Sequence, residues 1–265
     1  MTFAYFNNMP QRYFIRLAYD GSRYHGWQQQ NNALSIEHLV NEALGTVLRQ
    51  TIKVTGCGRT DAGVHAEEFY AHFDCDSAIE NKDSTAYNLN SLLPNDIVIH
   101  QILKVKEDAH ARFSAVRRTY KYYINTRRTP FGKEYEFFMH RKPDIVLMNQ
   151  ASKILMEYHD FSCFSKSHTQ VNNFICRIFE AGWQESGYRL VFTITANRFL
   201  RNMVRAIVGT MLDTGLHKIT LEEFRQVIEN GQRSGAGMSV PAQGLFLTKV
   251  EYPEEIFRTD QPLFY

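Results

Sequence analysis

Between two strand-like runs of the 265-residue chain lies the stretch Gly56-Cys57-Gly58-Arg59-Thr60-Asp61-Ala62-Gly63-Val64-His65-Ala66. Its glycines predict a tight loop, because glycine permits positive φ and the close approach of another molecule. Two interpretations of Asp61 are open at this point. Aspartate in a glycine-rich turn commonly bonds its own backbone. Alternatively, the loop presents the Asp61 carboxylate for chemistry, with the Arg59 guanidinium directed to an anionic substrate.

The segments around this loop predict a first half of alternating strands and helices. Residues 12–20 are expected to form a strand, because Tyr13, Ile15, Leu17 and Tyr19 share one face. The further elements expected are a helix after the N-cap Ser35, strands at 52–57 and 68–74, a helix at 85–93 that stops at Pro94, and a strand at 97–105. This order is that of ferredoxin-like and RNA-recognition folds, whose sheets often hold RNA on one face.

The rest of the chain repeats this order of elements, without a detectable sequence repeat. The elements expected are a strand at 118–126, a helix at 144–158, strands at 174–184 and 188–196 about a turn at Gly187, a helix at 199–214 ended by Gly215, a helix capped by Thr220 and Glu223 that ends at Gly231, and a strand at 244–252. We therefore predict an α+β fold of two ferredoxin-like (RRM-like) halves, 1–110 and 111–265. Their predominantly antiparallel sheets are expected to join into one extended sheet, with helices on one face and a catalytic cleft between the halves.

Composition argues against several classes of protein. The chain is 44% hydrophobic and 22% charged, as expected for a globular protein. No apolar run is long enough to span a bilayer, and residues 1–10 contain no basic region followed by an apolar core, so we expect neither a membrane protein nor a secretory signal. The four cysteines are far apart and none pairs with histidine at zinc spacing. We therefore expect no metal, no disulfide framework and a reducing, cytoplasmic location.

Positive charge is concentrated in residues 112–142. This segment holds nine Lys or Arg and two Glu, interleaved with aromatic residues, whereas the whole chain has a net charge of only +2. Such a segment suits a polyanion with stackable bases. It equally suits an edge strand whose Lys and Arg side chains prevent pairing with another chain. The pattern alone does not distinguish a nucleic-acid contact from such an edge strand. In the nucleic-acid interpretation, the contacts to backbone phosphates are Arg117, Arg118, Lys121, Arg127 and Arg128.

In the helix expected at 199–214, Arg205 lies at the margin of the apolar stripe. A guanidinium that leans over a packed interface there needs a specific anionic partner. The alternative is that the Arg205 side chain snorkels along the edge of the core. Without other information, the position of Arg205 in the stripe favours snorkelling.

Five motifs occur in order along nearly the whole chain. They are residues 58–66; Tyr19-Asp20-Gly21-Ser22 with Gly26-Trp27-Gln28; Ala111-Arg112-Phe113-Ser114-Ala115 with Arg118, Tyr120 and Tyr122; Phe199-Leu200 with Met203-Val204-Arg205 and Val208-Gly209; and Pro241-Ala242 with Gly244-Leu245. In this order they resemble the signatures of the tRNA pseudouridine synthase A family. Two departures from those signatures, Cys57 and the run Ser239-Val240-Pro241, leave the matched catalytic positions untouched.

The resemblance implies an isomerase without cofactor or metal, which converts uridine to pseudouridine at positions 38, 39 and 40 in the anticodon stem-loop of tRNA. It also implies a homodimer, with RNA lying across both subunits. Carried over position by position, it implies Asp61 as the nucleophile, Tyr120 as the ring that stacks on the target base, Arg205 as the ion-pair partner of Asp61, Arg59 as the residue that extrudes the target nucleotide and Leu245 as a lining of the base pocket. Arg118 and Lys121 are the substrate-binding cations expected beside them.

The chemistry suits these residue types. Isomerisation breaks the C1′–N1 bond, rotates the uracil and forms a C1′–C5 bond, which requires no redox step. A carboxylate can attack carbon or remove a sugar proton, and the sequence leaves open whether Asp61 attacks C1′, attacks C6 or acts as a base. Two other classes of protein are also open. One is a non-catalytic RNA-binding protein on the same scaffold, and the other is a hydrolase that pairs Asp61 with a second acid.

Other polar residues near these motifs have two interpretations each. A neutral imidazole at His65 could move protons. We favour a structural role for it, since the uridine chemistry already has its carboxylate and phenol. The loop residues His25, Trp27 and Gln28 either contact RNA or pack locally.

Overall fold

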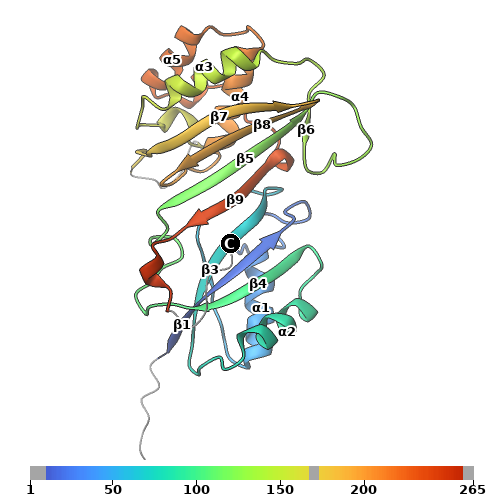
Figure 1. Cartoon of the computed structure of the whole chain (residues 1–265), viewed down its shortest axis with the longest axis vertical. Coiled ribbons are helices and arrows are strands. Elements are labelled where there is room, and N and C mark those ends of the chain that lie inside the picture. The colour runs from blue at the N-terminus through green and yellow to red at the C-terminus, as the bar shows by residue number, and fades with distance from the viewer. Residues whose placement is uncertain (1–9, 167–172, 259–265) are drawn as a thin grey trace, which may run out of the picture.

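The chain folds into helices and strands in the expected order. A computed structural model describes residues 10–166 and 173–258, and Figure 1 shows the arrangement. The first half consists of β1 (Gln11–Tyr19), α1 (Ile36–Leu48), β2 (Thr55–Gly56), β3 (His65–Cys75), α2 (Lys82–Leu92) and β4 (Ile97–Lys104). The second consists of β5 (Arg117–Asn125), β6 (Phe137–Phe138), α3 (Ile145–Leu155), β7 (Ile178–Ser186), β8 (Arg189–Ala196), α4 (Met203–Gly215), α5 (Leu221–Asn230) and β9 (Leu245–Glu251). Short 3₁₀ helices lie at Ser162–Phe164, Arg233–Gly235, Ala242–Gly244 and Glu254–Ile256.

The strands of the described residues form one nine-stranded sheet in the order β4-β1-β3-β9-β5-β8-β7, with β2 paired to β3 and β6 to β5. Both halves share one arrangement, β4-β1-β3-β2 in the first and β9-β5-β8-β7 in the second. The pairings are antiparallel except those of β3 with β9 and of β5 with β6. The parallel pairing of β3 with β9 joins the two halves. The predicted α+β fold with one extended, mostly antiparallel sheet is confirmed, and its strand order is ferredoxin-like.

One face of the sheet runs continuously from the first half into the second. Tyr19 lies opposite Ala66, Ala66 opposite Leu247, and Leu247 opposite Tyr120. All four side chains are buried or half-buried. Figure 1 shows α1 and α2 beside the lower part of the sheet and α3, α4 and α5 beside its upper part. Tyr120 therefore lies on this continuous face, close to the junction of the halves.

Two hydrophobic cores fill the two halves, and each takes residues from the other half. Leu247 and Val250 of β9 belong to the first core, whereas Val64, from the loop before β3, belongs to the second. Tyr120 packs against both cores. The division of the chain into 1–110 and 111–265 remains a prediction. Within the described ranges, no helix is long and apolar enough to cross a membrane.

The strand expected at 52–57 is much shorter in the structure. Only Thr55–Gly56 pairs as a strand, with β3. The Val54 amide donates instead to the Asn41 side chain of α1 at 2.8 Å, so this run packs against a helix before it reaches the sheet.

The start of the helix expected at 199–214 was also wrong. α4 begins at Met203, because Asn202 has a φ of 66°, in the left-handed region that a continuous helix excludes. Residues 199–202 therefore form a turn before the helix. The direction of their side chains cannot be read from helical periodicity.

The N-cap of α1 differs from the prediction in its bonding. Ser35 precedes the helix, but its buried hydroxyl has no hydrogen-bond partner among the described residues. The Ile36 and Glu37 amides donate instead to the backbone carbonyls of Gly26 and Trp27, at 3.3 and 3.0 Å. The loop after β1 therefore caps α1 with its backbone. At α5, by contrast, the predicted capping box of Thr220 and Glu223 is confirmed.

Candidate active site

The loop that carries Asp61 joins β2 to β3 and is clamped by the loop that follows β1. The hydroxyls of Tyr19 and Thr60 share a hydrogen bond of 2.9 Å. Glycine is required at Gly26, where φ is +89° and a Cβ would lie 2.3 Å from the Thr60 carbonyl oxygen. The Asp61 loop is therefore held against β1, and its conformation is fixed by a second loop far away in the sequence.

The Asp61 carboxylate lies between two guanidinium groups. Its Oδ2 is 3.5 Å from Arg205 Nη1 and its Oδ1 is 3.6 Å from Arg201 Nε. A tight hydrogen bond between such charged groups measures about 2.7–2.9 Å, so the carboxylate is flanked rather than locked. The turn itself closes through the backbone, since the Val64 amide donates to the Asp61 carbonyl at 3.1 Å. The side chain is therefore free of the turn and is presented to the arginines.

Arg205 is the better fixed of the two arginines. Its Nε donates to the Val240 carbonyl at 2.7 Å, and its own carbonyl accepts from the Val240 amide at 3.2 Å. The Arg205 side chain is 20% exposed, against 58% for Arg201. The guanidinium therefore reaches from the first turn of α4 to a carboxylate. This geometry supports an anionic partner over simple snorkelling.

Tyr120 lies beside this pair on β5. Its ring contacts Phe199 edge-on, with centroids 5.0 Å apart and planes at 88°. Burial raises the pKa of the Tyr120 phenol well above its ordinary value; the proximity of Cys57 and Asp61 acts in the same direction, and that of Arg118 opposes it. The phenol is therefore protonated at neutral pH. It can donate a hydrogen bond, but it is a poor general base on its own.

Arg118 differs from its expected role as a phosphate contact. It is only 8% exposed, and its guanidinium donates to backbone carbonyls: Cys57 at 2.9 Å, Asn197 at 2.8 Å and Arg112 at 2.6 Å. Cys57 leads into the Asp61 loop, and Asn197 leads towards α4. With its donors turned inwards, Arg118 holds together the segments that carry the site.

We expect Arg118→Gln to lower the free energy of unfolding by about 3 kcal/mol or more, because several buried carbonyls lose a charged donor. Thermal and urea unfolding measure the change. Arg117→Gln is the matched control: Arg117 is the exposed neighbour, whose guanidinium lies over the Phe179 ring. Equal stability of the two variants would contradict the stabilising role of the Arg118 hydrogen bonds.

A group of arginines borders the site. Arg59 is exposed, two positions from Asp61. Burial lowers the pKa of Arg112, and the nearby charges of Arg59, Arg198 and Arg118 lower it further. Cations this close repel one another and favour a bound polyanion. Arg59 is therefore exposed beside Asp61, among other cations.

Leu245 and Lys121 lie in different surroundings. Leu245 begins β9, is buried and pairs with Tyr122. Lys121 is half-buried and pairs with Phe246. It points to the opposite face of the sheet from its neighbour Tyr120, since successive side chains of a strand alternate. Lys121 therefore lies on the face of the sheet opposite Tyr120 and does not join the Asp61 site.

His65 lies on that opposite face and is buried. Its ring stacks on Phe246 with centroids 4.4 Å apart, and its Nδ1 accepts from the Gly21 amide at 3.1 Å and lies 3.0 Å from Asp20 Oδ1. Burial lowers the pKa of His65, with Asp20 opposing. A neutral, packed imidazole on the far face supports the structural role. Trp27 likewise packs locally, stacked on Phe69 at 4.1 Å.

Arg201 was missed as a contact of Asp61 by the sequence analysis. In a helix that began at residue 199, the Arg201 side chain would point between two core residues. The left-handed Asn202 turns the chain before α4 and directs Arg201 towards the carboxylate instead. Sequence offered no signal for this turn apart from the tolerance of asparagine for positive φ. The described residues contain no group of three His, Cys, Asp or Glu arranged to hold a metal ion.

A family model described as tRNA pseudouridine synthase matches residues 151–253, which include all of α4 and β9. This match indicates that the protein is of the class of tRNA pseudouridine synthases.

Relatives extend the match over most of the chain. The chain is 53% identical over 248 residues to tRNA pseudouridine synthase A of Bacteroides fragilis, which covers 93% of this chain and 98% of the relative. It is 51% identical over 250 residues to that of Bacteroides thetaiotaomicron, covering 93% of each chain. It is 38% identical over 240 residues to that of Clostridium acetobutylicum, covering 90% of this chain and 98% of the relative. The chain belongs to the tRNA pseudouridine synthase A family.

Proposed function

We propose that this chain converts uridine to pseudouridine at positions 38, 39 and 40 of the tRNA anticodon stem-loop, with Asp61 as the catalytic nucleophile. That the chain is an isomerase acting on tRNA follows from the family to which it belongs. One observation supports the assignment of Asp61 as the nucleophile. The Asp61 carboxylate is held on a clamped turn, between Arg205 and Arg201 and within the electrostatic reach of Tyr120.

Each side chain has a task in this reaction. A paired uridine must leave the stack to reach Asp61, at a cost of a few kcal/mol. Stacking on the Tyr120 ring returns roughly 1–3 kcal/mol. The Asp61 carboxylate then attacks the nucleotide or removes a proton, and the C1′–N1 bond breaks. The uracil turns and forms the C1′–C5 bond, and the bond to Asp61 breaks or the proton that it took returns. The proton on C5 leaves, and N1 gains one. Arg205 stabilises the carboxylate whenever it carries its full charge.

The remaining roles in the proposal come from the family resemblance and from position. Arg59 extrudes the target nucleotide, and its exposure beside Asp61 supports this. Leu245 lines the base pocket. The protein acts in the cytoplasm as a homodimer, and its site lies between the halves 1–110 and 111–265.

The alternatives have less support. A protein that only binds RNA gains nothing from a carboxylate facing a polyanion. A hydrolase needs a second acid beside Asp61, whereas the charged neighbours of its carboxylate are arginines.

Mapping pseudouridine in tRNA treated with the purified protein tests the proposal. A transcript with uridine at 38, 39 and 40 should gain carbodiimide-dependent primer-extension stops at those positions, and cytidine substitutions at the three positions should remove them. Modification elsewhere in the tRNA would overturn the position assignment, and no modification would overturn the activity. Sedimentation of the same preparation tests the dimer.

A further inference from the structure

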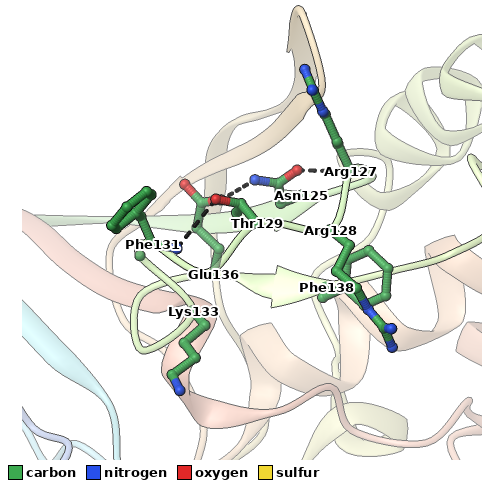
Figure 2. A pocket seen from close by; sticks show the side chains of 9 residues that line it. Asn125, Arg127, Arg128, Thr129, Phe131, Lys133, Glu136 and Phe138 are labelled. Carbon is green, nitrogen blue, oxygen red and sulfur yellow. Dashed lines mark hydrogen bonds between the residues drawn. The ribbon is translucent and has the colours of Figure 1, made fainter.

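A cation-lined pocket lies in the loop between β5 and β6, and none of its lining residues belongs to the Asp61 loop. Its volume is about 190 Å³. It is lined by Asn125, Arg127, Arg128, Thr129, Phe131, Gly132, Lys133, Glu136 and Phe138 (Figure 2). We call this segment, residues 125–138, the β5–β6 loop.

The loop carries three cations, Arg127, Arg128 and Lys133, and two carboxylates, Glu134 and Glu136. Glu136 is buried and already paired, since it meets Arg189 in an ion pair and accepts a hydrogen bond from Asn125 at 2.8 Å. In the described parts of the chain, no carboxylate pairs with Arg127, Arg128 or Lys133. The three cations are therefore available to an anion from outside.

Two of these cations are held in place by aromatic rings. The Arg127 guanidinium lies 5.0 Å from the centroid of the Tyr188 ring, and that of Arg128 lies 5.7 Å from the centroid of Phe138. Figure 2 shows Arg127 and Arg128 extending in opposite directions, with Lys133 on the Arg128 side. Because the cations spread instead of converging, they suit successive phosphates of one strand better than a single phosphate.

Phe131 stands at the tip of the loop, 82% exposed. The tip is ordered by local bonds: the Phe131 amide donates to Thr129 Oγ1 at 3.2 Å and the Tyr135 amide to the Gly132 carbonyl at 3.0 Å. An exposed aromatic ring among unpaired cations is the arrangement that holds single-stranded nucleic acid, with a base on the ring and phosphates on the cations.

The loop is anchored beside the Asp61 loop. Gln243 donates to the Lys133 carbonyl at 3.4 Å. The preceding residue, Ala242, lies against Gly63, since a Cβ on that glycine would be 3.3 Å from the Ala242 Cβ. Gly63 is two positions from Asp61. The loop itself packs on the opposite face of the sheet, where the Tyr135 ring contacts the rings of His65 and Phe246. An RNA that occupies both the loop and the Asp61 site must therefore pass the contact between Ala242 and Gly63.

We propose that the β5–β6 loop is a second RNA subsite, which stacks an unpaired base of the substrate on Phe131 and binds the flanking phosphates with Arg127, Arg128 and Lys133. This inference rests on the proposed function, because it takes the occupant to be the RNA strand that enters the Asp61 site. It predicts that the enzyme prefers a stem with unpaired loop nucleotides over a continuous duplex.

Binding of two fluorescent RNAs, a hairpin with an unpaired loop and a duplex of the same stem, tests the subsite. Phe131→Ala should weaken hairpin binding roughly 5- to 150-fold, the effect of losing one stacked base, and leave duplex binding nearly unchanged. The matched control is Tyr87→Ala, since Tyr87 is a 73% exposed aromatic on α2. The double variant Arg127→Gln/Arg128→Gln should reduce the slope of log affinity against log salt by about 1.4, as expected for two single-strand phosphates.

The outcomes separate this inference from the proposed function. If pseudouridine forms normally but Phe131→Ala binds the hairpin as the wild type does, the subsite is wrong and the function stands. If no pseudouridine forms at all, yet Phe131→Ala still weakens only the hairpin, the function is wrong and the subsite stands. A change of oligomeric state in Phe131→Ala without a loss of RNA affinity would make the loop a protein interface and overturn the subsite.

Discussion

Asp61→Asn is expected to reduce pseudouridine formation roughly 10³-fold or more while tRNA binding persists, as for the loss of a catalytic nucleophile. The amide is nearly isosteric with the carboxylate but lacks its charge and nucleophilicity. The loop should keep its conformation, because the turn is closed by the Asp61 carbonyl and the Val64 amide, which the substitution leaves intact. Single-turnover assays on a purified tRNA transcript measure the rate, and filter binding measures the affinity.

Two comparisons make this experiment decisive. Asp76→Asn removes the charge of an exposed aspartate just after β3 and should leave the rate unchanged. Asp61→Asn should bind tRNA at least as tightly as the wild type, since a negative charge facing the phosphates is gone. Turnover by Asp61→Asn at the wild-type rate would remove the carboxylate from the mechanism.

The local features of the fold could be predicted from the sequence. Alternating apolar residues indicated β1, and the pairing of Thr220 with Glu223 indicated the start of α5. Each of these signals lies within a few residues of the element it determines. The parallel pairing of His65 with Phe246, which joins the halves, has no such local signal because its partners are far apart in the chain.

The candidate site was also predicted only in part. The family motifs predicted that Asp61, Arg205 and Tyr120 act together, and the structure places the first two in an ion pair. The basic segment was harder to interpret, because a run of cations does not show which of them is buried. Arg118 proved to be turned inwards.

Strand alternation alone could have separated Lys121 from Tyr120, since neighbours in a strand face opposite sides. That signal is local to the strand and is present in the sequence. Arg201 is different, since its direction depends on one left-handed residue, and propensity gives only a weak indication of such a turn.

Arg205→Gln is expected to slow pseudouridine formation by roughly 10²-fold, a loss typical of removing one preorganised charged donor from a reacting group. Arg201→Gln is the matched control, because it removes a second guanidinium at almost the same distance from Asp61, 3.6 Å against 3.5 Å. We expect Arg201→Gln to cost less than tenfold. Arg201 is 58% exposed and must hold its position in solvent, whereas Arg205 is 20% exposed and bonded to the Val240 carbonyl.

Single-turnover rates and melting temperatures of both variants distinguish the roles open to Arg205. If Arg205 only covered the edge of the core, Arg205→Gln would lower the melting temperature while its folded fraction kept the normal rate. If the two arginines were equivalent partners of Asp61, both variants would lose the same rate. A larger loss in Arg205→Gln at nearly unchanged stability is the result expected from a guanidinium fixed by its backbone bond. Such a guanidinium meets the charge of Asp61 without reorganising during the reaction, which a solvent-exposed arginine cannot do.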